Sequence, residues 1–312
     1  MLQGIVDEIV REHVQLAAFQ WAQHRTLSQA YPPDQAAAGD IDARLRANLD
    51  AIEIAGDAAW PFILDQFEDF PEAGELFVAA YLAMVRGDRR RIDQSLWMAH
   101  QHPRARSGLA GALAWFPPDL SAPTVRRMLD AESAVQRAVA LDVLAAHGAD
   151  AGHRLVGFLK NASAMVRASA CTLAAATGRA DCAAEISKHA SAPDPDLRLA
   201  AASALARLGR TDAAFVPLKT EIEGGGPHSL AALRRLSETS EATDFRTYLG
   251  DLYQCGNTRS LAVRGIGMTG DRGHLDWLIG QMEVRETAVA AGESFLELFP
   301  EALSESALFT FA

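Results

Sequence analysis

A segment of about 14 residues recurs in the second half of the chain, and this recurrence constrains the fold more than any other feature. Its clearest copy is DLRLAAASALARLG, and the copies end at Gly148, Gly178, Gly209 and Gly270. The separations are 30, 31 and 61 residues, so one more copy fits near Ser240, and AVAAGESFLELFP ends at Pro300. A period of about 30 residues predicts a pair of short antiparallel helices, the unit of an α-solenoid.

The residues around each copy carry helix start and stop signals. Asp194 followed by Pro195 predicts an N-cap before a first helical turn, and Gly209 predicts a left-handed C-terminal residue. Ser163 is the expected cap of the equivalent helix. An aspartate after each glycine is expected to cap the following helix: Asp150, Asp181, Asp212 and Asp271. Two helices per unit are therefore predicted.

An arginine precedes each of the four glycines by 11 residues: Arg137, Arg167, Arg198 and Arg259. Two interpretations are open, a row of cations on a binding surface or a structural series that satisfies carbonyls and acids of neighbouring turns. We favour the structural series, because every repeat has exposed helix ends to satisfy, whereas a binding site needs only some repeats.

The N-terminal third has no 30-residue period and is expected to form a separate helical region. One long helix is predicted up to Tyr31-Pro32-Pro33, with its apolar face at Ile5, Ile9, Leu16 and Phe19. After a linker near 31–39, a second helix places Ile41, Leu45, Leu49 and Ile52 on one face and ends at Gly56. Further helices are expected over 57–70, 71–87 and 89–101. The fold class is all-α, with an N-terminal helical region over 1–103 and a solenoid of helix pairs over 104–312.

Composition narrows the class of partner and the compartment. The net charge is −11, and residues 1–100 hold 16 acidic side chains against eight arginines, which argues against nucleic acid as the main partner. The longest apolar run, 77–85, is about half the length a membrane helix needs, so no membrane partner is expected. The three cysteines are widely spaced, which favours reduced buried thiols and a cytoplasmic protein.

The repeated segment resembles the second helix of HEAT repeats, and more narrowly the short HEAT-like units of the phycobilin-lyase-like type. Gln136, Val166 and Leu197 stand before the arginines, as valine does in that pattern. The resemblance covers about residues 104–299. It implies the fold but no single activity, because scaffolds, lyases, a DNA glycosylase and a metal-dependent hydroxylase share such stacks.

The N-terminal residues EHVQLAAFQWAQHR and DIDARLRANLDAIEIAGDAAW resemble a bacterial family of HEAT-repeat proteins found with type VI secretion genes. The matching positions are His13, Phe19, Trp21, Arg25, Asp42, Arg44, Leu45, Leu49, Asp50, Ala55, Gly56 and Trp60. Asn48 and Ala51 depart from the family's usual His and Gly. This resemblance implies a genetic context and no established reaction.

His13 is expected to join a buried polar network that locks the N-terminal helix, in preference to a catalytic role. The residues assigned to structural networks are His13, Trp21, Arg25, Asp42, Arg44 and Asp50, together with Arg137, Arg167, Arg198 and Arg259.

Motifs for catalysis or metal binding are missing. No histidine is followed by Glu, and there is no HExxH, P-loop, GxGxxG or GxSxG. A metal site could be formed by His100, His102 and Asp93. However, two histidines at i and i+2 without further ligands are more typical of exposed residues. We therefore expect no catalytic residue, cofactor or metal.

The acidic segment DQFEDFPEAGE is the candidate protein-contact surface. It comprises Asp65, Phe67, Glu68, Asp69, Phe70, Glu72 and Glu75. Its alternative interpretation is a solvated loop between helices, yet aromatic rings among carboxylates also suit a protein partner with a basic surface. The following RGDRRR, from Arg86 to Arg91, is expected to end one helix and start the next, or to pair with the acidic segment of a neighbouring subunit.

Two functions of different classes follow from these features. The first is a non-enzymatic protein-binding scaffold in the bacterial cytosol, either a type VI secretion adaptor or an effector-binding immunity protein. The second is a lyase-like HEAT-repeat enzyme acting on a small molecule in a concave groove. Titratable side chains that converge in one pocket would favour the enzyme.

Overall fold

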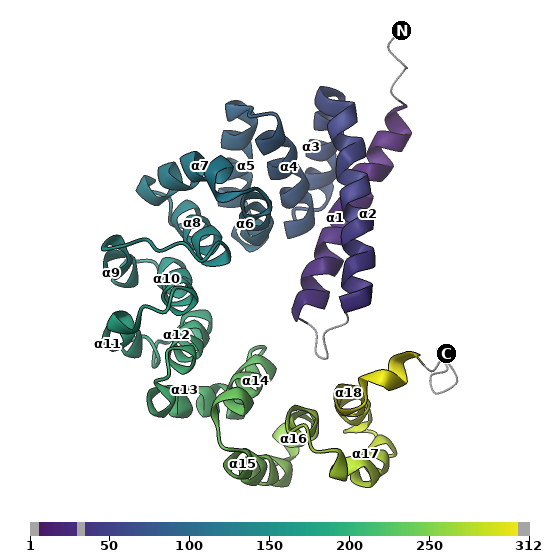
Figure 1. The fold of residues 1–312 in the computed structure, drawn as a ribbon, viewed down its shortest axis with the longest axis vertical. Coiled ribbons are helices and arrows are strands. Elements are labelled where there is room, and N and C mark those ends of the chain that lie inside the picture. The colour runs from purple at the N-terminus through teal and green to yellow at the C-terminus, as the bar shows by residue number, and fades with distance from the viewer. Residues whose placement is uncertain (1–5, 30–34, 305–312) are drawn as a thin grey trace. The chain divides into compact units, whose positions relative to one another are not determined.

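The chain is all-helical. A computed structural model describes residues 6–29 and 35–304, and within these ranges it contains no β-strand (Figure 1). The all-α prediction is therefore confirmed. The contacts divide the chain into two compact units, unit 1 at Met1–Thr177 and unit 2 at Gly178–Ala312. The predicted boundary between residues 103 and 104 rests on the repeat pattern and not on contacts, and it stays a prediction.

In unit 1 the helices pack neighbour to neighbour. The α-helices are α1 (Asp7–Gln29), α2 (Gln35–Ala55), α3 (Trp60–Asp69), α4 (Ala73–Val85), α5 (Arg89–Gln101), α6 (Arg106–Trp115), α7 (Pro118–Asp130), α8 (Ala134–Ala146), α9 (Arg154–Leu159) and α10 (Ala164–Ala176). Short 3₁₀ turns occupy Gly56–Ala59 and Pro103–Ala105. One row runs from α1 through α4, α6 and α8 to α10, while α3, α5, α7 and α9 contact that row from the side (Figure 1).

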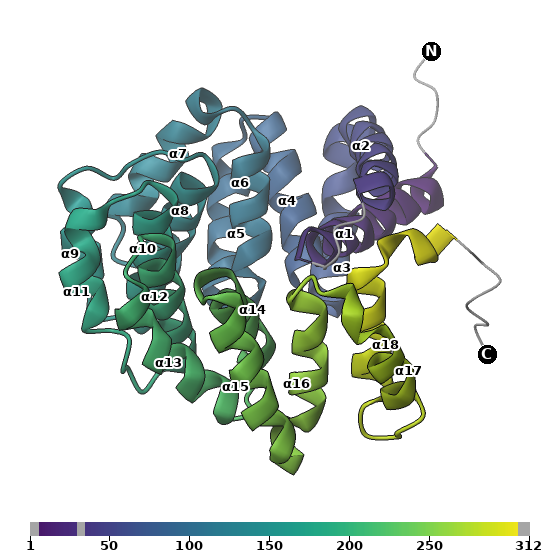
Figure 2. The same ribbon diagram turned by 60° about the horizontal axis from the view of Figure 1, so that its bottom comes forward.

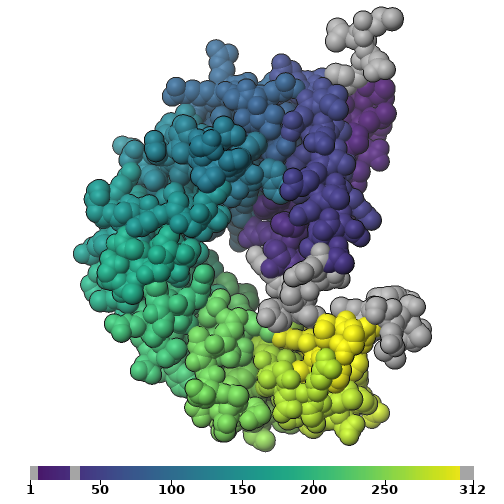
Figure 3. Space-filling model, viewed as in Figure 1, coloured from purple at the N-terminus to yellow at the C-terminus, as the bar shows by residue number. Residues whose placement is uncertain are grey.

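Unit 2 repeats this alternation. Its α-helices are α11 (Ala183–Ser187), α12 (Pro195–Arg207), α13 (Thr211–Glu223), α14 (Ser229–Thr239), α15 (Ala242–Gln254), α16 (Gly256–Met268), α17 (Leu275–Met282) and α18 (Ala288–Leu298), with 3₁₀ turns at Ala180–Cys182, Arg272–His274 and Pro300–Ser304. The row α12, α14, α16 and α18 alternates with α13, α15 and α17 (Figure 2). Side chains fill the spaces between successive helices within each unit (Figure 3).

The predicted stop signals agree with the backbone. All four repeat glycines have positive φ angles, from 63° at Gly148 to 75° at Gly209. This left-handed conformation is costly for other residues and ends a helix cleanly. Two helices therefore fill each 30-residue unit, as predicted.

The cap predictions are only partly confirmed. Asp194 accepts a hydrogen bond from the Leu197 amide at 2.8 Å, as expected of an N-cap. Ser163 stands at the N-cap of α10 but makes no capping hydrogen bond with its side chain, so that prediction was wrong. The side chain of Asn161 accepts from the Ser163 amide and orders this turn instead.

The aspartates after the glycines also differ from one another. Asp271 caps the 3₁₀ turn before α17. Asp150 accepts from the Gly152 amide within a turn, and Asp181 pairs with Arg179. Asp212 lies inside the first turn of α13, so it is not the cap.

The predicted apolar face of the first helix was wrong. Ile9, Leu16 and Phe19 are exposed, and Ile5 lies outside the described residues. The buried face carries Val10, Val14, Ala17, Ala18 and Trp21. Small residues face inward because α4 approaches closely: a Cβ added at Gly74 would overlap the carbonyl of Ala18. A bulkier side chain at Ala18 would hold the two helices apart, whereas Trp21 fits because Gly111 of α6 leaves room for its ring.

The second helix is longer than predicted. Leu45, Leu49 and Ile52 are fully buried, as expected, and Gly56 follows the helix with a φ of 60°. However, α2 begins at Gln35, so 35–39 is helix and not linker. Tyr31-Pro32-Pro33 lies outside the described residues.

Two remaining expectations concern the membrane and the cysteines. A membrane-spanning helix would need a longer apolar stretch than any helix in the described residues offers. Cys171 and Cys182 are buried, as expected, whereas Cys255 is exposed. Cys255 precedes α16, at the turn where α15 ends.

Candidate functional site

The acidic segment forms the end of α3 and the turn into α4. Phe70 is the C-cap of α3 and is 56% exposed. Exposed carboxylates surround it in sequence, at Asp65, Glu68, Asp69 and Glu72. Asp65 lies 3.9 Å from the Arg11 guanidinium, and both side chains are well exposed, so this pair contributes little. The turn thus presents one large apolar ring among acids.

Two residues assigned to this surface point inward. Phe67 is 6% exposed and packs edge-on against His102, so it belongs to the core. It faces inward because it lies four residues after Ile63, on the same buried face of α3. Glu75 is half-buried on α4, and burial raises its pKa despite a hydrogen bond with Gln66. The exposed candidate surface is therefore Phe70 with Asp65, Glu68, Asp69 and Glu72.

RGDRRR joins α4 to α5, as expected. Arg86 is the C-cap of α4, and Gly87 follows with a φ of 60°. Asp88 caps α5 by accepting hydrogen bonds from the amides of Arg90 and Arg91. Arg91 also pairs with Asp57 at 2.8 Å, so this basic run is partly neutralised within unit 1.

The N-terminal polar network has a different centre from the one predicted. His13 Nδ1 lies 2.7 Å from Asn48 Oδ1, and Asn48 donates to Gln20 Oε1 at 2.9 Å. Asn48 and Gln20 are both buried between α1 and α2. Asn48, where the resembled family tends to have histidine, therefore holds the network together.

The other residues assigned to that network lie elsewhere. Trp21 is buried and stacks on Phe77, with Arg25 over its ring at 5.9 Å. Asp42 Oδ1 lies 3.4 Å from His24 Nε2, not near His13. Arg44 and Asp50 have exposed side chains that make no hydrogen bond or ion pair with the described residues, because they lie on the outer face of α2.

Three of the four repeated arginines share one contact. Each is the fourth residue of its helix and donates to the carbonyl six residues before it, which caps the end of the preceding helix or turn. Arg167 donates to Asn161 O at 2.6 Å, Arg198 to Ala192 O at 2.8 Å and Arg259 to Tyr253 O at 3.2 Å. For these three residues the structural interpretation agrees with the contacts.

Arg137 departs from this series. Among the described residues its half-buried side chain has no hydrogen-bond or ion-pair partner, so its assignment to the structural series was wrong. Nearby, Arg154 from α9 donates to Leu129 O at 3.1 Å and to the Asp130 carboxylate at 2.6 Å. Arg154 thus contacts the end of α7, whereas the carbonyl six residues before Arg137 is that of Ala131.

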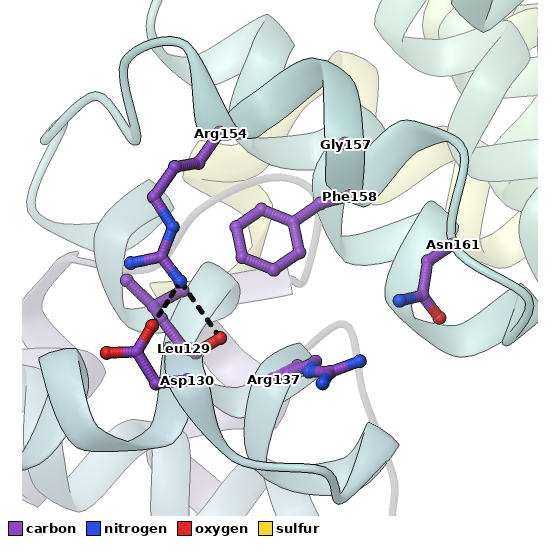
Figure 4. Close-up of a pocket in the computed structure, with 7 residues that line it drawn as sticks. All are labelled: Leu129, Asp130, Arg137, Arg154, Gly157, Phe158 and Asn161. Carbon is purple, nitrogen blue, oxygen red and sulfur yellow. Dashed lines mark hydrogen bonds and ion pairs between the residues drawn. The ribbon is translucent and has the colours of Figure 1, made fainter.

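Arg137 instead lines a cavity of about 390 Å³ in unit 1. The other lining residues are Leu129, Asp130, Arg154, Gly157, Phe158 and Asn161. Figure 4 shows the Arg154 guanidinium turned toward Asp130 and the Arg137 guanidinium turned away from it, to the side where Asn161 lies. We call this the Arg137 cavity.

A second hollow lies beside the start of α8, the helix that carries Arg137. It has a volume of about 410 Å³ and is lined by α5 residues and by Ser133 and Gln136. Trp97 forms part of its wall and is 60% exposed. Neither Trp97 nor the Arg137 cavity was predicted, because both depend on which residues α5, α8 and α9 bring together.

The histidines and the carboxylate near these hollows have separate partners. Within the described ranges no three His, Cys, Asp or Glu side chains gather to hold a metal ion. His100 Nδ1 contacts Ser133 Oγ at 3.4 Å and His102 packs on Phe67, so these two histidines point to different partners. In the Arg137 cavity the one carboxylate, Asp130, is paired with Arg154.

Comparison with known proteins adds no relative: no family model matches this sequence, and neither does any curated protein.

Proposed function

We propose that this chain is a non-enzymatic protein-binding scaffold built as an α-solenoid of HEAT-like helix pairs. Three features support this proposal: the 30-residue recurrence, the alternation of two helix rows within each unit, and the arginine that caps the preceding turn in three repeats. Stacked helix pairs of this kind offer extended surfaces for a partner.

The observation that carries the proposal is the exposed Phe70 among exposed carboxylates. A buried aromatic ring dominates the energy of many protein interfaces, while charges around it steer the encounter and select the partner. Acids at Asp65, Glu68, Asp69 and Glu72 favour a partner with a basic surface. The contribution of these acids should weaken with added salt, whereas that of the Phe70 ring should persist.

The cellular role rests on the sequence resemblance. By that resemblance the partner is a secretion component or a secreted effector in the bacterial cytoplasm, and the chain acts as an adaptor or as an immunity protein. The two roles differ in one outcome: an immunity protein protects cells from the toxin that it binds.

The test uses products of adjacent genes as bait for the full chain. Phe70→Ser should weaken retention of the partner by about tenfold or more, since interface aromatic anchors often contribute at least 1.4 kcal/mol. Phe215→Ser is the matched control, because Phe215 is also an exposed phenylalanine, at 40%, and lies on α13 in unit 2. Retention that survives Phe70→Ser, or no retention of any neighbour product, would count against this surface as the contact site.

A further inference from the structure

We propose that the Arg137 cavity of unit 1 binds a carboxylate attached to an apolar group, such as the end or an acidic side chain of a peptide. This site is separate from the acidic turn around Phe70 and has the opposite charge preference. It therefore does not depend on the function proposed above.

The first step is the uncompensated charge of Arg137. The three equivalent arginines each donate to a carbonyl oxygen six residues back. Arg137 is half-buried in a cavity wall and has none of these contacts among the described residues. A guanidinium presents five donors in a fixed fork, and a carboxylate can accept two of them at once.

The second step is the charge balance of the cavity. The two arginines, Arg137 and Arg154, face a single carboxylate, Asp130. Asp130 is already bound by Arg154 at 2.6 Å, so one positive charge is left over. A ligand with one negative charge would neutralise it. A phosphate monoester carries about −1.5 to −2 near neutral pH and would also approach Asp130, so a carboxylate fits better.

The third step is the remaining lining. Leu129 and Phe158, each 8% exposed, form the apolar edge of the lining, with the Arg154 guanidinium over the Phe158 ring at 5.5 Å. Gly157 leaves space because it has no side chain. The Oδ1 atom of Asn161 accepts from the Ser163 amide, which leaves its Nδ2 group to donate to a ligand. Figure 4 shows this nitrogen on the side of Asn161 that faces the cavity. The hollow has a volume of about 390 Å³ and is open to solvent, so it suits the exposed end of a larger molecule.

The experiment follows the side-chain Nε–Hε signals of arginine by NMR while N-acetyl-L-phenylalanine is added to the full chain. We expect a saturable shift of the Arg137 signal with a dissociation constant on the order of 1 mM, as suits one charged contact and one ring. N-acetyl-L-phenylalanine amide has the same ring without the carboxylate and should bind at least about tenfold more weakly.

Two variants separate the site from general charge effects. Arg137→Gln should weaken binding about tenfold or more, whereas Arg126→Gln, at an exposed position on α7, should leave it unchanged. Melting curves of both variants should match the parent chain, because Arg137 holds no structural contact among the described residues. Phenyl phosphate is added in a separate titration as the phosphate probe. The proposal would be overturned if the Arg137 signal showed no saturable shift, if the amide bound as well as the carboxylate, if phenyl phosphate bound more tightly, or if Arg137→Gln left binding unchanged.

Discussion

At the scale of single residues, one residue type at one repeat position takes two roles. Arg167, Arg198 and Arg259 satisfy carbonyls at the end of a preceding turn, while Arg137 lines a cavity and makes no such contact among the described residues. A recurring residue in a sequence therefore identifies equivalent positions, but the role at each position is determined by the contacts that the side chain makes.

Arg198 should stabilise the fold far more than Arg137 does. Arg198 also binds the carboxylate of Glu221, which is 6% exposed and would be left without its cation. We expect Arg198→Gln to lower the free energy of unfolding by about 3 kcal/mol, and Arg137→Gln to change it by less than about 0.5 kcal/mol. Urea denaturation of both variants measures the difference, and equal losses would show that our distinction between them is mistaken.

Glu297 should make unit 2 sensitive to acid. Burial alone would raise its pKa, but hydrogen bonds from Arg234 and Arg264 outweigh burial and hold the pKa below the usual 4.5. Glu293, the other acid beside Arg264, is more exposed. A carboxyl with a lowered pKa stabilises the folded chain above its unfolded pKa and loses this contribution as the pH falls through its folded pKa.

The matching variant is Glu297→Gln. Its free energy of unfolding should fall short of the parent value most at neutral pH, and the gap should close as the pH drops below 4.5. Denaturation at a series of pH values measures this gap. A gap that stays constant from neutral to acid pH would rule out ionised Glu297 as the source of the acid sensitivity.

At the scale of helices, close approach explains why unit 1 buries small residues. A Cβ at Gly74 would overlap the backbone of α1, and one at Gly108 would overlap the Ala73 carbonyl of α4. Gly111 leaves room for Trp21, whose Cζ2 atom would lie 2.6 Å from an added Cβ. These glycines set the spacing of α1, α4 and α6 and thereby the positions of Phe77 and Trp21.

Gly108→Ala should therefore destabilise the chain although alanine favours helices. The added methyl group forces α4 and α6 apart, at a cost of about 1–3 kcal/mol or more. Gly250→Ala is the control, because Gly250 is exposed within α15 and has no atom within 4 Å of an added Cβ. That variant should gain up to about 1 kcal/mol. Thermal unfolding measures both, and a gain at Gly108 would contradict the close packing.

The helices could be predicted from the sequence, whereas their faces and the candidate site could be predicted only in part. The glycines and the 30-residue period are local signals, and local backbone preference produced the expected helix ends. The face of α1 could not be read from periodicity, because Ile9 and Leu16 form one stripe and Val14 and Ala18 another. The choice depends on α4, which is distant in sequence. The Arg137 cavity likewise depends on Arg154 from another helix.

At the scale of the whole chain, the contacts fall into two units, and each has its own buried core. In unit 1 the core includes Leu45, Phe77 and Leu141, which are fully buried. In unit 2 Val263, Leu278 and Ala291 form a separate buried cluster. Structures built from stacked helix pairs respond to a defect mainly through nearest neighbours. Stability should therefore vary along the chain.

Hydrogen exchange should reveal this variation. In Gly108→Ala, amides of α4 and α6 should exchange faster than in the parent chain, while amides of α14, α16 and α18 should change far less, because the defect lies in unit 1. Mass spectrometry of peptides after exchange measures each region in one experiment. Equal acceleration in both units would mean that the chain opens as a single cooperative body.

The arginine contacts that precede α10, α12 and α16 have a consequence for how such a chain can diversify. Each guanidinium donates a hydrogen bond to a main-chain carbonyl oxygen, an atom that every amino acid supplies. This hydrogen bond therefore does not depend on the side chain of the residue that accepts it. At Ala192 the small side chain can therefore change in one lineage or in a designed library while the contact is retained. Asn161 and Tyr253 are more constrained, because Asn161 also orders its turn and Tyr253 packs on Trp277.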